Sequence, residues 1–152
     1  MPDAPHIILA FDYGTRRIGV ASGDTLTGTA RALTALQCTP NVPWPQIDRL
    51  VEEYRPHQFV VGLPYNMDGT PTLLTEASRR FAIELKSRYA QSVALVDERL
   101  SSREASEQLR EARARGLKRR RTTREDIDMI AARILLERWF DNPAAAQEVG
   151  KL

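Results

Sequence analysis

The stretch IILAFDYGTRRIGVA, residues 7–21, contains the pattern that decides the fold. An apolar run from Ile7 to Phe11 leads into the polar turn Asp12-Tyr13-Gly14-Thr15, and a second extended run from Ile18 to Ser22 follows. Two such runs around a short glycine-containing turn are typical of a β-hairpin. The sequence therefore predicts two antiparallel strands near its start, with Asp12 directly after the first apolar run.

Further along the chain, short extended runs alternate with amphipathic helical spacing. The expected order is three strands, helix, strand, helix, strand, helix, helix. Strands joined first by hairpins and then by helical crossovers give a mixed α/β sheet with helices on both faces, here with five strands. Capping-box spacing opens the last two helices, at Ser101 and Thr123. The expected elements cover residues 7–11, 18–22, 27–36, 47–54, 59–63, 74–85, 93–96, 101–116 and 123–142.

Length and composition indicate one ordinary globular domain, because the chain has 152 residues of which 42% are hydrophobic. We place that domain at residues 1–142 and expect residues 143–152, which begin with a proline, to form a frayed tail. No apolar run approaches the roughly 20 residues that span a bilayer, and the start lacks the pattern of a signal peptide. A cytoplasmic protein without membrane contact is expected.

Few residues could bind a soft metal. Cys38 is the single cysteine, and His6 and His57 are the two histidines, so neither an intrachain disulfide nor a zinc-like ligand set is expected. Any metal would be held by oxygen atoms.

Charge is distributed unevenly although the formal net charge is only +2. Residues 103–124 contain nine basic and three acidic side chains, a local balance of +6, so the rest of the chain carries −4. Such asymmetry suggests a polyanionic partner, although a solvated helix face followed by a basic loop is the more common origin of a charge run.

Two carboxylates follow expected strands. Asp12 comes after the first and Glu98 after the last, and the carboxyl ends of strands in open sheets usually form ligand sites. Each residue alone could also be an ordinary turn former.

A third carboxylate, Asp128, lies on the helix that begins at Thr123. In helical register it shares a face with Ala131 and Ala132, whereas Asp126 lies about 200° away and should face water. A charge on a packing face needs compensation, which a divalent cation or the free N–H groups of the first helical turn could supply. The alternative is that Asp128 only caps or solvates that turn.

Acidic ligands without histidine or cysteine suit Mg²⁺ or Mn²⁺ better than zinc. Hydrolysis of a phosphodiester requires such ligands, since two cations roughly 4 Å apart can activate the attacking water and stabilise the leaving oxygen. We therefore expect Asp12, Glu98 and Asp128 to converge as metal-binding catalytic residues, with Asp12 as the bridging ligand.

Four blocks of the chain resemble the YqgF (RuvX) family of RuvC-related nucleases, in family order. They are FDYGTRRIGVA at residues 11–21, GLP with NMDG at residues 62–64 and 66–69, DERLSS at residues 97–102, and DMIAARIL at residues 128–135. The resemblance implies a ribonuclease H-like fold and catalytic acids at Asp12, Glu98 and Asp128. It also implies a cytoplasmic bacterial nuclease that matures the 5′ end of pre-16S ribosomal RNA or, by its likeness to RuvC, resolves Holliday junctions.

The family pattern further suggests that Arg17 and Arg99 lie near the site. Either could hold a phosphate oxygen or form a structural salt bridge. This chain departs from the family pattern at residues 114–121, where a dense basic segment replaces a glycine-containing loop. Its side chains Lys118, Arg119, Arg120 and Arg121 are expected to bind a nucleic-acid backbone, that of an rRNA precursor or of branched DNA.

Two other classes of protein fit parts of the pattern. Asp12-Tyr13-Gly14-Thr15 also resembles the phosphate-binding turn of actin-like ATPases and sugar kinases, but those sites lie between two lobes and this chain has the length of one. A non-catalytic nucleic-acid-binding module is the third reading. RNA or DNA substrate, exo- or endonucleolytic cleavage, and a monomer or a weak dimer all remain open at this point.

Overall fold

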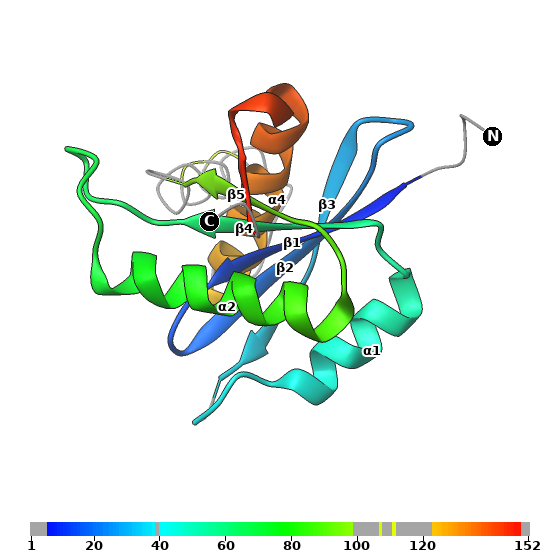
Figure 1. The fold of residues 1–152 in the computed structure, drawn as a ribbon, viewed down its shortest axis with the longest axis horizontal. Coiled ribbons are helices and arrows are strands. Elements are labelled where there is room, and N and C mark those ends of the chain that lie inside the picture. Colours follow the sequence, from blue (N-terminus) through cyan, green and yellow to red (C-terminus); the bar gives the residue numbers. More distant parts are fainter. Residues whose placement is uncertain (1–5, 39, 99–106, 108–110, 112–122, 150–152) are drawn as a thin grey trace.

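The structure is a computed structural model that describes residues 6–38, 40–98, 107, 111 and 123–149. Its strands are β1 (Ile7–Tyr13), β2 (Arg17–Asp24), β3 (Thr29–Gln37), β4 (Gln58–Leu63), β5 (Val93–Asp97) and β6 (Gln147–Glu148). Its helices are α1 (Trp44–Tyr54), α2 (Leu73–Tyr89), α4 (Arg124–Asp141) and the short 3₁₀ helix η1 (Pro143–Ala145). The strands form one sheet in the order β3-β2-β1-β4-β5-β6 (Figure 1).

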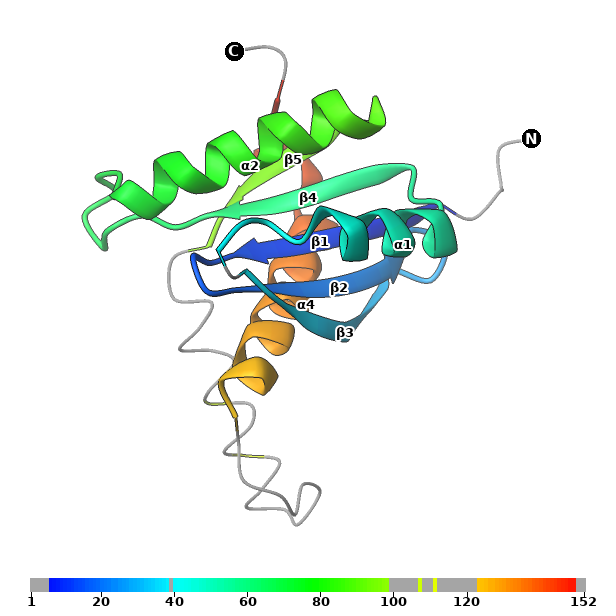
Figure 2. The same cartoon turned by 90° about the horizontal axis from the view of Figure 1, so that it is seen from below.

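The sheet is mixed, as the sequence predicts. β1, β2 and β3 form an antiparallel meander, and β4 and β5 then add parallel to β1. α1 and α2 provide the two crossovers and cover one face, while α4 covers the other, as Figure 2 shows from the side of α1 and α2. Within the described residues, no helix is long and apolar enough to cross a membrane.

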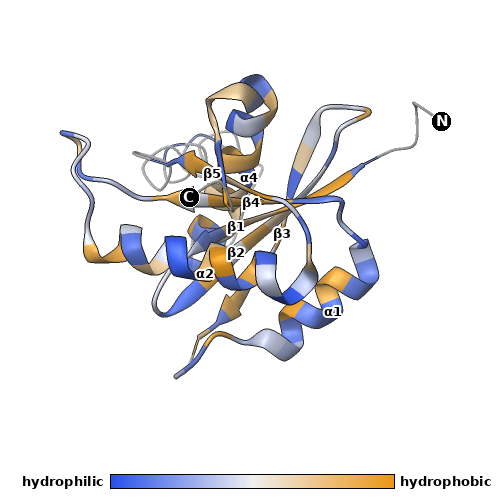
Figure 3. Ribbon diagram, viewed as in Figure 1, coloured by the Kyte–Doolittle hydropathy of each residue, from blue (hydrophilic) through white to orange (hydrophobic). Residues whose placement is uncertain are grey.

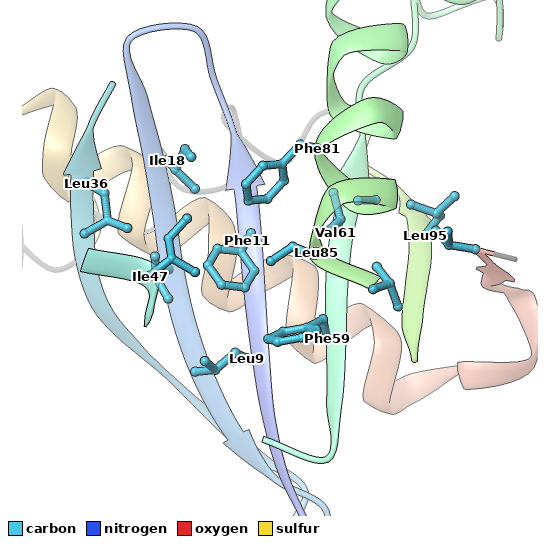
Figure 4. Close-up of a cluster of buried hydrophobic side chains, with 14 of the residues drawn as sticks. Leu9, Phe11, Ile18, Leu36, Ile47, Phe59, Val61, Phe81, Leu85 and Leu95 are labelled. Carbon is cyan, nitrogen blue, oxygen red and sulfur yellow. The ribbon is translucent and has the colours of Figure 1, made fainter. Parts of the chain in front are cut away.

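Alternation along the strands separates two hydrophobic clusters. On the α1 and α2 face, Leu9 and Phe11 of β1 pack with Phe59 of β4 and Phe81 of α2 (Figure 4). On the α4 face the strands contribute smaller side chains, such as Ala10, and α4 adds its own apolar residues. Figure 3 shows the consequence, since α1 and α2 each carry both hydrophobic and hydrophilic residues around their axes.

The chain end differs from the expectation. Instead of fraying after Pro143, it forms η1 and then β6, which pairs antiparallel with β5, and Val149 is buried in the core. The sheet therefore has six strands and not five. The β5 edge offers free backbone hydrogen-bonding groups, and pairing with β6 satisfies part of them.

One expected helix, residues 101–116, and the basic segment that follows it lie outside the described residues, apart from two exposed helical positions, Glu107 and Glu111. The last helix begins as expected. Thr123 is its N-cap, its hydroxyl accepts from the Asp126 N–H at 3.2 Å, and the Asp126 carboxylate accepts from the Thr123 N–H at 3.0 Å.

Candidate active site

The carboxyl ends of β1, β4 and β5 meet at one edge of the sheet because these strands are parallel. Asp12 lies near the end of β1, and Glu98 directly follows β5, where its N–H donates to the Leu63 carbonyl of β4 at 3.1 Å. β4 separates the two strands that carry these acids. The Glu98 side chain must therefore cross β4 to reach Asp12.

Gly62 makes this crossing possible. A Cβ atom at position 62 would overlap with the Glu98 side chain, on its Oε2 and Cδ atoms. The strand register places Gly62 beside Asp12, because the preceding residues, Phe11 and Val61, are partners in the β1–β4 ladder. Glycine at this position thus leaves the space in which the Glu98 carboxyl lies over the strand and contacts Asp12.

The two carboxyl groups share a buried environment that opposes their ionisation. Burial raises the pKa of Glu98 well above its usual value, and the Asp12 charge raises it further. The pKa of Asp12 rises to about 6, chiefly through burial, with the Asp128 charge adding to the rise and a hydrogen bond from protonated Glu98 opposing it. Only 7% of Glu98 is exposed, and its buried Oε2 atom has no hydrogen-bond partner among the described residues.

A pair of this kind suits a cation. Two adjacent carboxyls with raised pKa values cost free energy when both ionise, and a divalent ion would compensate both charges and bind the unpartnered Oε2 atom. The donors are all oxygen atoms, as Mg²⁺ and Mn²⁺ prefer. The buried, unpartnered Oε2 atom and the oxygen donors of Asp12 and Glu98 therefore suit a divalent cation.

Asp128 approaches from α4, on the same face of the sheet. Its backbone packs directly on β2, because a Cβ atom at Gly19 would overlap with the Asp128 carbonyl oxygen. Gly19 pairs with Asp12 across the β1–β2 ladder. Asp128 thus lies near Asp12, and its charge adds to the rise in the pKa of Asp12 that burial causes.

The carboxylate of Asp128 forms an ion pair with Arg17. The Arg17 Nε atom lies 2.6 Å from Asp128 Oδ2, and the two side chains are 18% and 25% exposed. Asp128 is the fifth residue of α4, directly after the first turn. Arg17 supplies a compensating positive charge.

The expectation for Asp126 was wrong. It is buried, at 3% exposure, and forms the capping box with Thr123 described above. Helical periodicity places a residue on one side of a helix, but near the first turn a carboxylate is also drawn to the free backbone N–H groups.

The three predicted acids do not form a closed ligand set. Within the part of the chain that the structure describes, no group of three or more histidine, cysteine, aspartate or glutamate side chains is arranged to hold a metal ion. Asp12 and Glu98 contact each other, whereas the Asp128 carboxylate is turned to Arg17. A metal-binding role for all three stays a prediction.

The predicted basic residues divide into two groups. Arg17 lies at the site and forms the salt bridge that the sequence left open as one alternative, while its role toward phosphate stays a prediction. Arg99, Lys118, Arg119, Arg120 and Arg121 lie outside the described residues.

Sequence reasoning missed Arg138. This α4 side chain donates from Nη1 to the Asp97 carbonyl at 3.3 Å, and its charge lowers the pKa of Glu98. Its position one turn after Ile134 in α4 does not by itself indicate the strand end that it meets.

Comparisons with known proteins give similar sequences over most of the chain. A family model described as "RuvX: Holliday junction resolvase" matches residues 6–142. A Yersinia pestis (strain Pestoides F) protein named "Putative pre-16S rRNA nuclease" is 48% identical over 142 residues, which cover 93% of this chain and 99% of that protein. A protein of the same name from Yersinia pseudotuberculosis serotype IB is 47% identical over the same length and the same shares of each chain.

Solved structures of RuvC share the fold. Thermus thermophilus RuvC in complex with a Holliday junction substrate superposes with a TM-score of 0.57, at 14% sequence identity, covering 95% of this chain and 99% of that chain. A further Thermus thermophilus RuvC structure gives a TM-score of 0.55 at 14% identity, with 94% and 99% covered. The expected ribonuclease H-like fold is thereby confirmed.

Proposed function

The chain belongs to the RuvX family, and from that premise we propose that it is a metal-dependent nuclease that hydrolyses phosphodiester bonds in a precursor of 16S ribosomal RNA. The substrate class follows from the relatives at 47–48% identity, whose name is that of a pre-16S rRNA nuclease. We place the enzyme in the cytoplasm, where ribosomal RNA precursors are processed in bacteria.

One observation carries the proposal: Glu98 lies across β4, over Gly62, against Asp12. Nothing in the packing of a sheet requires two carboxyls to be brought together at a strand end, and the burial that raises their pKa values makes it costly for both to be ionised without a cation. Clusters of groups with perturbed pKa values are typical of catalytic sites.

The residues have distinct roles in this proposal. Asp12 and Glu98 would hold Mg²⁺ or Mn²⁺, with Asp128 approaching from α4 as the third ligand. When bound, such ions supply Lewis-acid stabilisation of the charge on the phosphodiester and activate water for attack. Asp12 would be the ligand closest to both of the other acids, because β1 lies between β4, which Glu98 crosses, and β2, on which the Asp128 backbone packs.

The basic segment is the proposed backbone-binding surface. Replacing Lys118, Arg119, Arg120 and Arg121 by Ala should weaken binding to RNA of any sequence and flatten its salt dependence, by about 0.7 in log–log slope for each lost contact to a single strand. Cleavage of saturating substrate should be retained. An unchanged salt slope would exclude these side chains from the interface.

Resolution of Holliday junctions is the second candidate, since the matching family model carries that description and a RuvC of the same fold is known in complex with a junction. A resolvase cuts two symmetric strands and is expected to act as a dimer, whereas an enzyme that trims RNA has no such requirement.

The experiment that tests the proposal offers both substrates to one preparation. Purified protein is incubated with Mn²⁺ and either a labelled precursor carrying the 5′ end of 16S rRNA or a labelled four-way DNA junction, with the Asp12→Asn protein as control. Cleavage of the RNA by the parent protein alone supports the proposal. Cleavage of the junction alone would support the second candidate function. If neither substrate is cleaved, both candidate functions are contradicted.

A further inference from the structure

We infer that Arg17 is a positioning residue for Asp128: it holds one carboxylate oxygen through its Nε–H and leaves the other oxygen available to bind a cation. This inference rests on the proposed function, because it concerns how the third acid is presented to a metal. It goes beyond the expected contact between Arg17 and phosphate.

The backbone of Asp128 is placed by β2. Gly19 allows the α4 backbone to approach so closely that any larger residue at that position would overlap with the Asp128 carbonyl oxygen. Gly19 also faces Asp12 in the β1–β2 ladder, so the approach brings α4 to the level of the acidic pair. The position of the main chain at residue 128 is thereby set, but the direction of its carboxylate is not.

Arg17 sets that direction. It lies two residues before Gly19 on β2 and therefore on the same face of the sheet. Its Nε atom lies 2.6 Å from Asp128 Oδ2, which makes this a short charge-assisted hydrogen bond. Among the described residues, Oδ1 of Asp128 has no hydrogen bond, so one oxygen is held and the other is available as a ligand.

This division of the two oxygens is the arrangement that orients ligands in metal sites. Carboxylates that bind a metal are commonly held by a hydrogen bond from a second residue, and loss of such a partner typically weakens metal binding about 10- to 100-fold. Arg17 also carries a positive charge, which by itself opposes cation binding. Orientation and charge therefore act in opposite directions and must be separated by experiment.

A matched pair of variants achieves the separation. In Arg17→Gln the amide nitrogen Nε2 lies as many bonds from Cα as Nε does in arginine, so a donor is kept and the charge is lost. In Arg17→Met a methyl group occupies that position, so the hydrogen-bond donor and the charge are both lost. The two variants have the same charge, and any difference between them reports the hydrogen bond alone.

The test measures the Kd of Mn²⁺ for the full-length protein without substrate, by calorimetry or by the electron paramagnetic resonance of free Mn²⁺. Arg17→Gln should bind Mn²⁺ at least about 10-fold more tightly than Arg17→Met does. Equal Kd values would overturn the inference. If Arg17→Met does not fold, as judged by circular dichroism, Arg17→Ala replaces it in the same comparison.

A double-mutant cycle identifies the oxygen donor through which Arg17 acts. When Asp128→Asn is added to both variants, the difference in Kd between Arg17→Gln and Arg17→Met should vanish, since the carboxylate that they orient differently is gone. A difference that persists there would overturn the inference, because Arg17 would then act through another group.

Failure of the inference can be told apart from failure of the proposed function. Binding of Mn²⁺ with the expected ranking, but no cleavage of either nucleic acid, would remove the function and leave the role of Arg17. Cleavage by the parent protein together with equal Kd values for the two variants would support the proposed function and contradict the role of Arg17. No measurable Mn²⁺ binding by the parent protein would overturn both.

Discussion

The two faces of the sheet are filled by different kinds of side chain. On the α1 and α2 face, Phe11 packs against Phe59 and Phe81 with ring centroids 5.9 and 5.6 Å apart. On the α4 face, Gly19 and Gly62 leave space that the Asp128 backbone and the Glu98 side chain enter. One face buries large apolar area, and the other gives up part of that area so that charged groups can approach.

This difference indicates where stability and chemistry lie in the molecule. Apolar burial on the first face contributes free energy of folding. On the second face Asp12 and Glu98 cost free energy whenever they ionise together, as their raised pKa values indicate. Substitutions on the first face should therefore lower stability, and substitutions at the acidic pair should lower metal binding or cleavage. Four predictions test this separation.

The largest effect is expected for Asp12→Asn. This change removes a charge from the acidic pair and leaves the aromatic face intact, so cleavage of the RNA precursor should fall by at least about 1,000-fold, while RNA binding and the melting temperature do not fall. Single-turnover cleavage assays and a binding titration make the measurement. Cleavage at the parental rate would mean that the observed activity belongs to a contaminant or to another site.

Phe59→Ala on the opposite face should cost about 3–5 kcal/mol of unfolding free energy, as expected for the loss of a fully buried aromatic side chain. Denaturant unfolding gives this value, and the Mn²⁺ affinity of the folded protein should stay within about two-fold. Leu73→Ala is the control, because Leu73 is 92% exposed and its loss should change stability by less than about 0.5 kcal/mol. A large loss of Mn²⁺ affinity in Phe59→Ala would show that the faces are not independent.

Gly62→Ala, in contrast to Phe59→Ala, should weaken Mn²⁺ binding. The added methyl group takes the space of the Glu98 carboxyl, so Mn²⁺ binding should weaken about 10- to 100-fold, the usual range for a displaced metal ligand or its support. Gly23→Ala is the matched control on the same face, since its methyl group would meet the apolar side chains of Leu136 and Phe140 on α4. It should lower stability and spare Mn²⁺ binding, and an equal loss of affinity in both variants would contradict the assignment.

The smallest effect concerns pH. The folded protein keeps protons on Asp12 and Glu98 at pH values where the unfolded chain has lost them, because both pKa values are raised on folding. The stability that Asp12 contributes without metal should therefore be fully present below its usual pKa and be lost as pH rises through about 6, by about 1–2 kcal/mol between pH 5 and 7 at about 1.4 kcal/mol per pKa unit. The contribution of Glu98 has the same sign.

Thermal or chemical unfolding at several pH values measures this fall. Asp12→Asn should remove most of it, and millimolar Mn²⁺ at pH 7 should offset it in the parent protein. Asp48→Asn is the control on the other face, because hydrogen bonds from Tyr89 and Arg88 lower the pKa of Asp48 and give it the opposite pH dependence. Stability that rises steadily from pH 5 to 7 would contradict the raised pKa values.

Local patterns were sufficient for most of the fold. The hairpin of residues 7–22, the two crossovers and the capping box at Thr123 each depend on residues close together in the chain. The same holds for the placement of Asp12 and Glu98 at strand ends, since a strand end is visible as the point where an apolar run stops.

Contacts between distant segments were not accessible in this way. The prediction of a frayed tail was wrong because the partner of β6 is β5, about 50 residues earlier in the chain. Asp126 was placed in solvent because periodicity describes the sides of a helix and not the requirements of its first turn. Both errors concern hydrogen-bonding groups whose partners cannot be identified from hydrophobic spacing.

By itself, then, the sequence determined the order and type of β1 to β5, α1, α2 and α4, and indicated the three acids that lie on these elements or directly after them. Only the tertiary structure decided how those acids meet: Glu98 reaches Asp12 because β4 lies between their strands and carries Gly62 there, and Asp128 turns to Arg17, which is 111 residues away in the chain. The physical reason is that strand order and helix approach are set by packing across the whole sheet, whereas propensity and periodicity act over a few residues.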